Sequence, residues 1–340
     1  MALTLEEVAQ KAGVSRSTVS RVVNAHPSVR DEVRERVWQV IRDTGYQPHA
    51  AARSLVTRRT RIIGVIIPEA VNTLLGTPFF ARFLAGVTHT CNLREYNLML
   101  SLFDSPAGQR EMYRRVLGSG YLDGVIVAST PVDDPLIPQL LEDNVPWVLA
   151  GRHPDERVNY IDVDNALGAR MAVEHLIRLG HRRIATVAGP PGMISAQDRL
   201  LGYKQALEAY RIPIDDALII PGDFTEDGGT AATQRILSAS PTAVFAATDS
   251  TASGVLKGIR EAGMQVPQDI ALVGFDDIPL ATSLDPALTT IRQPIEELGS
   301  MAASLLLDIL ENPPDSGAPA HQMILPVKLI VRASCGALSY

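Results

Sequence analysis

Apolar residues recur at helical spacing near the start of the chain, in stretches bounded by residues that begin and end helices. Thr4 and Glu7 have the spacing of a capping box, and the helical pattern continues from there for about two turns. Gly13 suits the left-handed position that ends a helix, and Ser15 and Thr18 can cap a second one. The pattern predicts a helix-turn-helix.

The second predicted helix has one apolar face and one polar face. A third helix, predicted over Asp31–Thr44, ends before Gly45 and completes a small three-helix unit. A polar helix on such a unit fits the major groove of DNA, where arginine side chains read guanine edges. The alternative is a solvated helix face without a partner. The candidate base-reading residues are Arg16, Ser17 and Arg21.

From Arg61 onward, short β-rich runs alternate with helical patterns. Such alternation predicts an α/β fold with parallel sheets wrapped by helices. The remainder of the chain is too long for one such sheet with a single core, so we expect two lobes. The strand-like runs are "IIGVII", "NLMLSLF", "GVIVA", "WVLAG", "RIATVAG", "AVFAA" and "IALVGF".

The charge distribution separates the first part of the chain from the rest. Residues 1–60 carry ten Lys/Arg and six Asp/Glu, a local charge of +4. Because the net charge of the whole chain is −7, residues 61–340 carry −7 − 4 = −11. A basic head on an acidic body is compatible with double-stranded DNA as a partner, although the total charge is negative.

Composition excludes several other classes of protein. The apolar runs are far shorter than the ~20 residues of a membrane span, and the acidic start lacks the pattern of a secretory signal, so we expect a cytoplasmic protein. The two cysteines, Cys91 and Cys335, lie far apart without metal-ligand spacing. We expect no metal, no cofactor and no disulfide.

The segments "TLEEVAQKAGVSRSTVSRVVN" and "GYQPHAAARSL" resemble the lactose repressor/galactose repressor (LacI-GalR) family of bacterial transcription regulators. The resemblance implies a head over residues 1–47, a hinge helix and linker over 48–60, and an effector-binding and dimerisation body over 61–340. It implies that Arg16, Ser17 and Arg21 read bases. Glu7 and His49 stand where the family usually has Asp and Asn. Further candidate DNA contacts are Thr4, Ser15, Thr18, Asn24, His49, Arg53 and Leu55, the last as a minor-groove wedge.

The body resembles the type I periplasmic sugar-binding fold, with "RIATVAGP", "RLLGY", "VPQDIALVGFDD" and "LTTIRQP" as landmarks. The resemblance implies an N-lobe over about 61–160 and 292–322, a C-lobe over about 161–291 and 323–340, and an effector between them. Gly151 and Thr248 stand where the family commonly has Asp and Asn, so no particular sugar follows. The implied effector contacts are Phe79, Phe80, Ser195, Arg199, Phe224, Thr248, Asp249, Asp276 and Gln293.

The function predicted from these patterns is a repressor whose affinity for a palindromic operator is controlled by a sugar or sugar derivative. A purine or nucleoside effector is the alternative within the same class. A sugar-transport binding protein would need an export signal and no basic head, and the phosphate-loop, HExxH and GxSxG motifs of common enzymes are absent. The chain shows no heptad tail for a tetramer, which predicts a homodimer.

Overall fold

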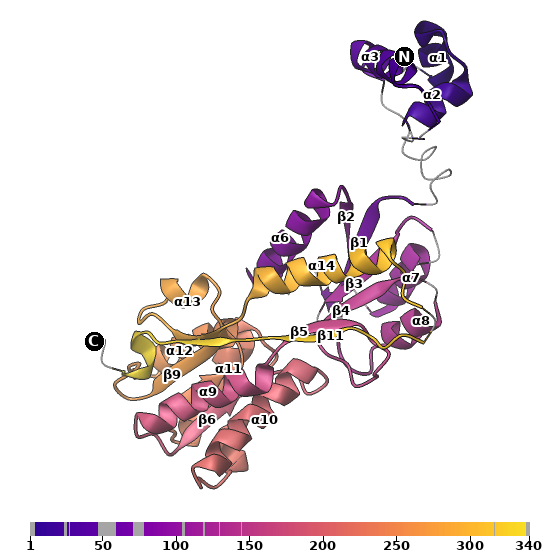
Figure 1. The fold of residues 1–340 in the computed structure, drawn as a ribbon. Helices are drawn as coiled ribbons and strands as arrows, with labels where there is room; N and C mark the ends of the chain where they lie inside the picture. The colour runs from indigo at the N-terminus through magenta and orange to yellow at the C-terminus, as the bar shows by residue number, and fades with distance from the viewer. Residues whose placement is uncertain are drawn as a thin grey trace. The chain divides into compact units, whose positions relative to one another are not determined.

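The computed structural model describes residues 4–23, 26, 28–46, 59–70, 78–103, 106–117, 120–128, 130–143, 145–315 and 317–337 (Figure 1). The chain divides into two compact units, Met1–Arg61 and Ile62–Tyr340. Within the described ranges, no helix is both long and apolar enough to span a membrane.

The first unit contains α1 (Leu5–Ala12), α2 (Arg16–Val23) and α3 (Asp31–Thr44). The predicted capping box is present, since the Glu7 amide donates to Thr4 Oγ1 at 3.3 Å and the Thr4 amide donates to Glu7 Oε2 at 2.6 Å. Gly13 ends α1 with a φ of 63°, in the left-handed region that favours glycine. The predicted helix-turn-helix is confirmed. Its core consists of Val8, Ala9, Ala12, Val19, Val22, Val37, Ile41 and Tyr46.

The second unit contains two six-stranded sheets, and we call the part built on the first sheet the N-lobe. Its strand order is β11-β5-β4-β3-β1-β2, and all neighbours are parallel. Helices α6 and α14 cover one face of this sheet, and α7 and α8 cover the other. The strands are β1 (Ile62–Ala70), β2 (Asn97–Phe103), β3 (Gly124–Ala128), β4 (Trp147–Ala150), β5 (Tyr160–Val163) and β11 (Gln322–Leu325); the helices are α6 (Pro78–Leu93), α7 (Pro106–Leu117), α8 (Leu136–Glu142) and α14 (Ile295–Glu311).

Alternation along β3 explains how one strand serves both faces of this sheet. Ile126 packs with the helices of one face, whereas Val125 and Val127 pack with those of the other. Helices α6 and α14 approach each other closely through two glycines. A Cβ on Gly86 would lie 1.9 Å from the Glu296 carbonyl oxygen, and one on Gly299 would lie 2.2 Å from that of Phe83.

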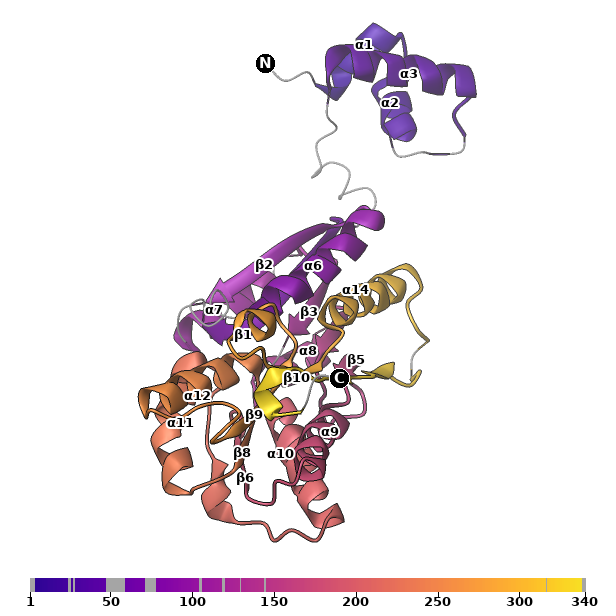
Figure 2. The ribbon, with the colours of Figure 1, turned by 90° about the vertical axis from the view of Figure 1, so that its left-hand side faces the viewer.

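The C-lobe is built on the second sheet, in the order β12-β10-β9-β8-β6-β7. All its neighbours are parallel except the antiparallel pair of β10 and β12. Figure 2 shows α9 and α10 on one side of this sheet and α11 and α12 on the other. The strands are β6 (Ile184–Val187), β7 (Ile219–Ile220), β8 (Ala243–Ala246), β9 (Ala271–Asp276), β10 (Thr289–Arg292) and β12 (Lys328–Ile330); the helices are α9 (Asn165–Arg178), α10 (Ile194–Ala209), α11 (Glu226–Ser238), α12 (Asp249–Glu261) and α13 (Leu280–Ser283), with short 3₁₀ turns η1 (Asp216–Leu218) and η2 (Ala333–Cys335).

The chain passes between the lobes after β5, after β10 and after β11. Because β5 and β11 both pair within the first sheet, the lobe changes lie at residue 164 and at residues 326–327. The expected lobe boundaries, after about residues 160 and 322, instead fall within β5 and β11. The expected and observed boundaries differ because the sheet to which a strand belongs is set by its pairing with other strands, and the residues of the strand alone do not reveal that pairing.

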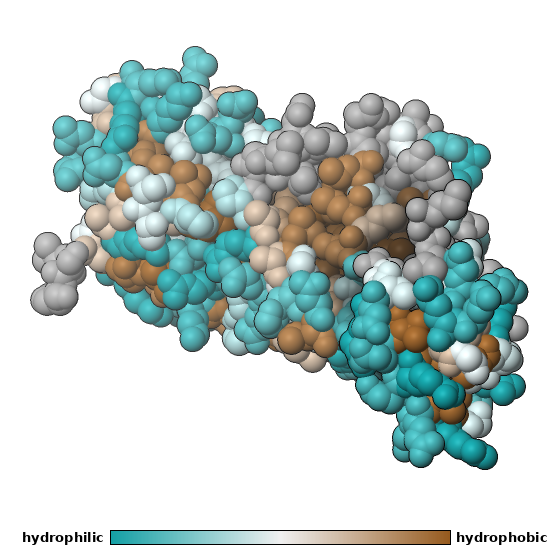
Figure 3. Space-filling view, turned by 90° about the horizontal axis from the view of Figure 1, so that it is seen from above, coloured by the Kyte–Doolittle hydropathy of each residue, from teal (hydrophilic) through white to brown (hydrophobic). Residues whose placement is uncertain are grey.

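Large apolar side chains also reach the surface, and Figure 3 shows hydrophobic residues intermixed with hydrophilic ones on one face. Leu93 and Tyr121, for example, are each 70% exposed. Scattered exposed apolar residues are normal for folded proteins. We therefore assign no interface from hydropathy alone.

Candidate functional site

The polar face of α2 is exposed, as the sequence predicts. Arg16, Ser17 and Arg21 are all exposed, and the Ser17 hydroxyl shares a 2.8 Å hydrogen bond with the Ser15 hydroxyl. The Arg16 guanidinium lies 3.9 Å from Glu6, but both side chains are about 70% exposed, so this contact contributes little. The arginines are therefore available to a partner.

The other candidate DNA contacts divide into two groups. The Ser15 hydroxyl accepts from the Thr18 amide at 3.1 Å, and Thr4 caps α1, so these residues also begin helices. Helix N-termini are favourable places for phosphate groups. The remaining candidates lie outside the described residues, and their roles stay predictions: Asn24, His49, Arg53 and Leu55.

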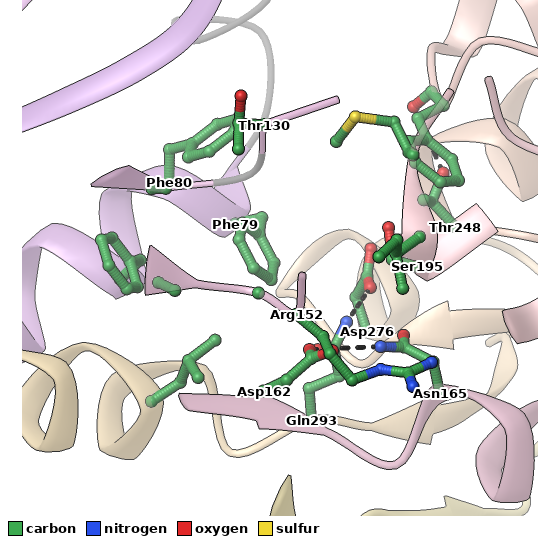
Figure 4. A pocket seen from close by; sticks show the side chains of 18 of the residues that line it. Phe79, Phe80, Thr130, Arg152, Asp162, Asn165, Ser195, Thr248, Asp276 and Gln293 are labelled. Carbon is green, nitrogen blue, oxygen red and sulfur yellow. Dashed lines mark hydrogen bonds between the residues drawn. The ribbon is translucent and has the colours of Figure 1, made fainter. Parts of the chain in front are cut away.

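A cavity of about 1040 Å³, counting the space open to solvent, lies between the two lobes at the carboxyl ends of their strands (Figure 4). In open parallel sheets this is where ligands bind. The lining residues are Phe79, Phe80, Phe83, Ala128, Thr130, Leu149, Ala150, Gly151, Arg152, Asp162, Asn165, Met193, Ile194, Ser195, Arg199, Asp223, Phe224, Thr248, Asp276, Gln293 and Leu298.

Most of the expected effector contacts line this cavity, and Asp249 does not. The Asp249 side chain is fully buried, with Oδ1 accepting from Thr290 Oγ1 at 2.5 Å and Oδ2 from the Ile278 amide at 2.9 Å. Burial raises its pKa well above the usual value, and the neighbouring Asp276 carboxylate adds to the rise. Asp249 therefore joins α12 to β10 and the segment after β9, and it does not lie at the cavity where the sequence placed it. The expected residues that do line the cavity are Phe79, Phe80, Ser195, Arg199, Phe224, Thr248, Asp276 and Gln293.

Arg199 and Asp276 form the polar floor of the cavity. Arg199 Nε donates to Asn165 Oδ1 at 2.9 Å, and Nη1 donates to the Ala247 carbonyl at 2.5 Å and lies 3.6 Å from Asp276 Oδ1. The guanidinium also stacks on the Phe275 ring, 3.8 Å from its centroid. These contacts hold the guanidinium in one orientation.

The ionisation of the floor is set mainly by burial. Burial raises the pKa of Asp276 to about 6, against the lowering effect of Arg199 and of a 2.5 Å hydrogen bond from Gln293 Nε2. Burial likewise lowers the pKa of Arg199 from its usual value, and Asp276 opposes this. The pair is ionised at neutral pH but carries a desolvation cost, which is common at binding sites.

Two cavity residues have backbone conformations that side chains rarely adopt. Phe224 has a φ of 68° and Asp276 a φ of 120°. Such residues persist only where the surrounding structure enforces them, and they concentrate at ligand sites. Gly189 makes room for Phe224, since a Cβ there would lie 2.1 Å from a ring atom. The strain is independent support for a ligand site at this cavity.

The two lobes contribute different chemistry. Phe79, Phe80 and Phe83 from α6 give the N-lobe side an apolar wall, with the first two rings edge to face at 5.4 Å. The C-lobe side supplies most of the polar groups. Figure 4 shows the aromatic rings of Phe79 and Phe80 apart from the polar cluster of Asp162, Asn165, Asp276 and Gln293. Such a site suits a molecule with both hydroxyl groups and C–H faces.

Sequence reasoning missed several polar residues of the cavity. Thr130 Oγ1 is buried and has no hydrogen-bond partner within the described part of the chain. Arg152 bridges the lobes, donating from Nη2 to both Asp198 carboxylate oxygens, at 2.6 and 2.5 Å. Asp162 lies within the short buried strand β5. This position could have been recognised from the sequence, because a carboxylate in an otherwise apolar strand is costly to bury without a partner or a function.

Comparison with known proteins accounts for both parts of the chain. The model of the family described as bacterial regulatory proteins, lacI family, matches residues 4–49, and that of the periplasmic binding protein-like domain matches residues 173–335. The HTH-type transcriptional regulator CelR of Thermobifida fusca is 40% identical over 336 residues, 97% of this chain and 98% of the relative.

Solved structures agree with these matches. A complex of the transcriptional regulator CelR with cellobiose has a TM-score of 0.77 and 38% identity, covering 98% of this chain and 99% of that one. The lac repressor dimer bound to operator and the anti-inducer ONPF has a TM-score of 0.85 and 29% identity, with the same coverage. The chain belongs to the lacI family of bacterial regulatory proteins and is a ligand-controlled, DNA-binding transcriptional regulator.

Proposed function

We propose that the protein is a homodimeric repressor that binds a palindromic operator, with an affinity set by a sugar or sugar derivative in the inter-lobe cavity. The observation that carries the proposal is the cavity itself, in which the Arg199–Asp276 floor faces an aromatic wall across two lobes. Two copies of a helix-turn-helix related by a two-fold axis require two inverted half-sites.

In this proposal Arg16, Ser17 and Arg21 read base edges in the major groove. Their exposure on α2 supports the assignment. Thr4, Ser15, Thr18 and Asn24 contact phosphates, and His49, Arg53 and Leu55 act in the hinge.

A sugar is favoured as the effector because its hydroxyl groups match the polar floor. Asp276 can accept hydrogen bonds from hydroxyl groups, Arg199 can donate hydrogen bonds in a fixed direction, and the aromatic rings can face the C–H groups of the sugar ring. Ser195, Phe224, Thr248 and Gln293 complete the contacts, and the cellobiose complex of the similar CelR supports this class. Residue Gly151 adds space and no side-chain contact.

The protein acts in the cytoplasm, where its operator is, and turns over no substrate. The carboxylates of the cavity are occupied in binding. Incubation with the bound sugar followed by product analysis tests this, and any turnover would contradict it.

DNA recognition is tested by selecting bound sequences from random DNA and titrating the selected site. Arg16→Ala and Arg21→Ala should each cost about 1–3 kcal/mol and relax preference at one base pair per half-site. Arg170→Ala, on the surface of the C-lobe, is the control and should bind normally. Selected sites without dyad symmetry would exclude the symmetric dimer. An equal loss for all sequences would exclude base reading by these arginines.

Effector control is tested by repeating the operator titration with sugars and with nucleobases. We expect a sugar to change operator affinity, and Asp276→Asn to reduce the response. A response to nucleobases alone would replace the sugar by the purine alternative.

A further inference from the structure

Asp162 supplies a carboxylate to the cavity from the N-lobe. Of the described N-lobe residues that line the cavity, it alone carries a carboxylate. It lies one residue before the end of β5, near Gly151, whose amide donates to the Ile161 carbonyl at 2.8 Å. Gly151 has a φ of 124°, which favours glycine, so a side chain is not easily placed there.

The Asp162 carboxylate has one engaged and one free oxygen. Oδ1 accepts from the Val163 amide at 2.8 Å and from Asn165 Nδ2 at 3.3 Å. Within the described ranges, Oδ2 accepts no hydrogen bond from the protein, although the residue is only 6% exposed. An acceptor oxygen of a mostly buried residue that lines a cavity and has no partner in the protein is available to a ligand or to water.

The neighbouring guanidinium groups are committed elsewhere. Arg152 forms its ion pair with Asp198, and Arg199 forms its ion pair with Asp276. Burial raises the pKa of Asp162 to about 6, and Asp198 adds to the rise, whereas the hydrogen bond from the Val163 amide and the two arginines lower it. Asp162 therefore places a further buried negative charge at the cavity that is not neutralised by an ion pair of its own.

We propose that Asp162 is a specificity-determining residue of the effector site, where its free oxygen accepts a hydrogen bond from an effector hydroxyl group and excludes anionic ligands. The proposal rests on the proposed function and narrows the effector to an uncharged, polyhydroxylated molecule. Sugar phosphates and sugar acids are rejected, because their charge would lie against a buried carboxylate.

The position of Asp162 also gives the effector a contact in each lobe. Asp276 and Arg199 hold the ligand from the C-lobe, and Asp162 holds it from the N-lobe. A ligand that bonds to both binds the closed arrangement of the lobes more tightly than an open one, and this difference is what shifts the equilibrium.

The test is calorimetric titration of the full chain without DNA. The probes are D-glucose, D-ribose, D-galactose and cellobiose, together with glucose 6-phosphate, ribose 5-phosphate and galactose 6-phosphate. We expect at least one neutral sugar to bind, and the phosphate esters to bind at least 10-fold more weakly than their parent sugars. Asp162→Asn should weaken the neutral ligand at least 10-fold and reduce the discrimination to under 3-fold. Glu297→Gln, an exposed residue of α14, is the control and should bind as the wild type does.

Two further readouts separate ligand binding from a structural role. Affinity of the wild type should fall as the pH is lowered from 7 to 5, because Asp162 and Asp276, whose pKa values burial raises to about 6, both lose their acceptor charge. The fall should be smaller in Asp162→Asn, in which only Asp276 still titrates. The unliganded variant should melt no lower than the wild type, since the amide keeps the Oδ1 acceptor and removes a buried charge.

Three results would overturn the proposal: no neutral sugar binding below 10 mM, a phosphate ester binding as tightly as its parent sugar, or unchanged affinity in Asp162→Asn. Operator titrations with the same ligands distinguish this from failure of the proposed function. A phosphate ester that alters operator affinity would refute the role of Asp162 and leave ligand control intact. A neutral sugar that binds through Asp162 without altering operator affinity would support the role of Asp162 and refute ligand control of operator binding.

Discussion

Replacing Arg199 by alanine should destabilise the C-lobe as well as abolish effector binding. The guanidinium donates to the Ala247 carbonyl and to Asn165 Oδ1, and it is the ion-pair partner of the buried Asp276. Removing one member of a buried ion pair costs about 3–5 kcal/mol, because the other charge stays buried without compensation. At roughly 2–4 °C per kcal/mol for a unit of this size, the Tm should fall by roughly 10 °C.

The pH dependence of this loss follows from Asp276. With Arg199 present, burial already raises the pKa of Asp276 from 3.8 to about 6, so ionising this carboxyl costs more in the folded state than in the unfolded chain. Because the folded-state pKa is raised, this cost is present above about pH 6 and disappears as the pH falls toward 4. Without Arg199 the pKa rises further, so the destabilisation should be large at pH 7.5 and clearly smaller at pH 5.

Differential scanning calorimetry of the full chain at the two pH values measures the effect. Asp276→Asn in the Arg199→Ala background should recover part of the stability at pH 7.5, since it removes the uncompensated charge. The matched control is Arg170→Ala, which breaks a partly exposed pair with Glu174. Because Glu174 keeps its ion pair with Arg178, this change should shift the Tm little. An Arg199→Ala protein that melts within 1 °C of the wild type at pH 7.5 would refute the reasoning.

Three further predictions concern a cap, a glycine and the inter-lobe ion pair. Thr4→Ala removes the cap of α1 and should cost about 1 kcal/mol, measured as faster hydrogen exchange of the α1 amides; unchanged exchange would contradict it. Gly189→Ala places a methyl group against the Phe224 ring and should lower stability by about 1–3 kcal/mol in thermal melts, with recovery when Phe224→Ala is added. Arg152→Ala should weaken effector binding by a few-fold in a salt-dependent way, within the ~1 kcal/mol of a partly exposed pair. Asp198→Asn should give the same loss, and additive losses in the double variant would show that the two residues act separately.

The local features of this protein were determined by short stretches of sequence. The capping box of Thr4 and Glu7, the left-handed Gly13 and the third helix over Asp31–Thr44 depend on residues within a few positions of one another, and all are present. The strand-like runs of the body were found for the same reason, and central ones such as β3 and β8 are apolar enough to be buried on both faces of a sheet. The short β7 and α8 carry too few residues to show a clear period.

The tertiary structure decided which polar side chains meet at the cavity. Asp249 and Asp162 are both buried carboxylates near strand ends, yet Asp249 points to Thr290 and Asp162 lines the cavity. The direction of each side chain depends on strand register and on how the lobes face each other, which residues far apart in the sequence determine together. The positive φ of Asp276 and the pairing of Arg152 with Asp198 are likewise enforced by surroundings distant in the chain. Local periodicity identifies the elements and their order, whereas packing between elements orients the side chains that a ligand meets.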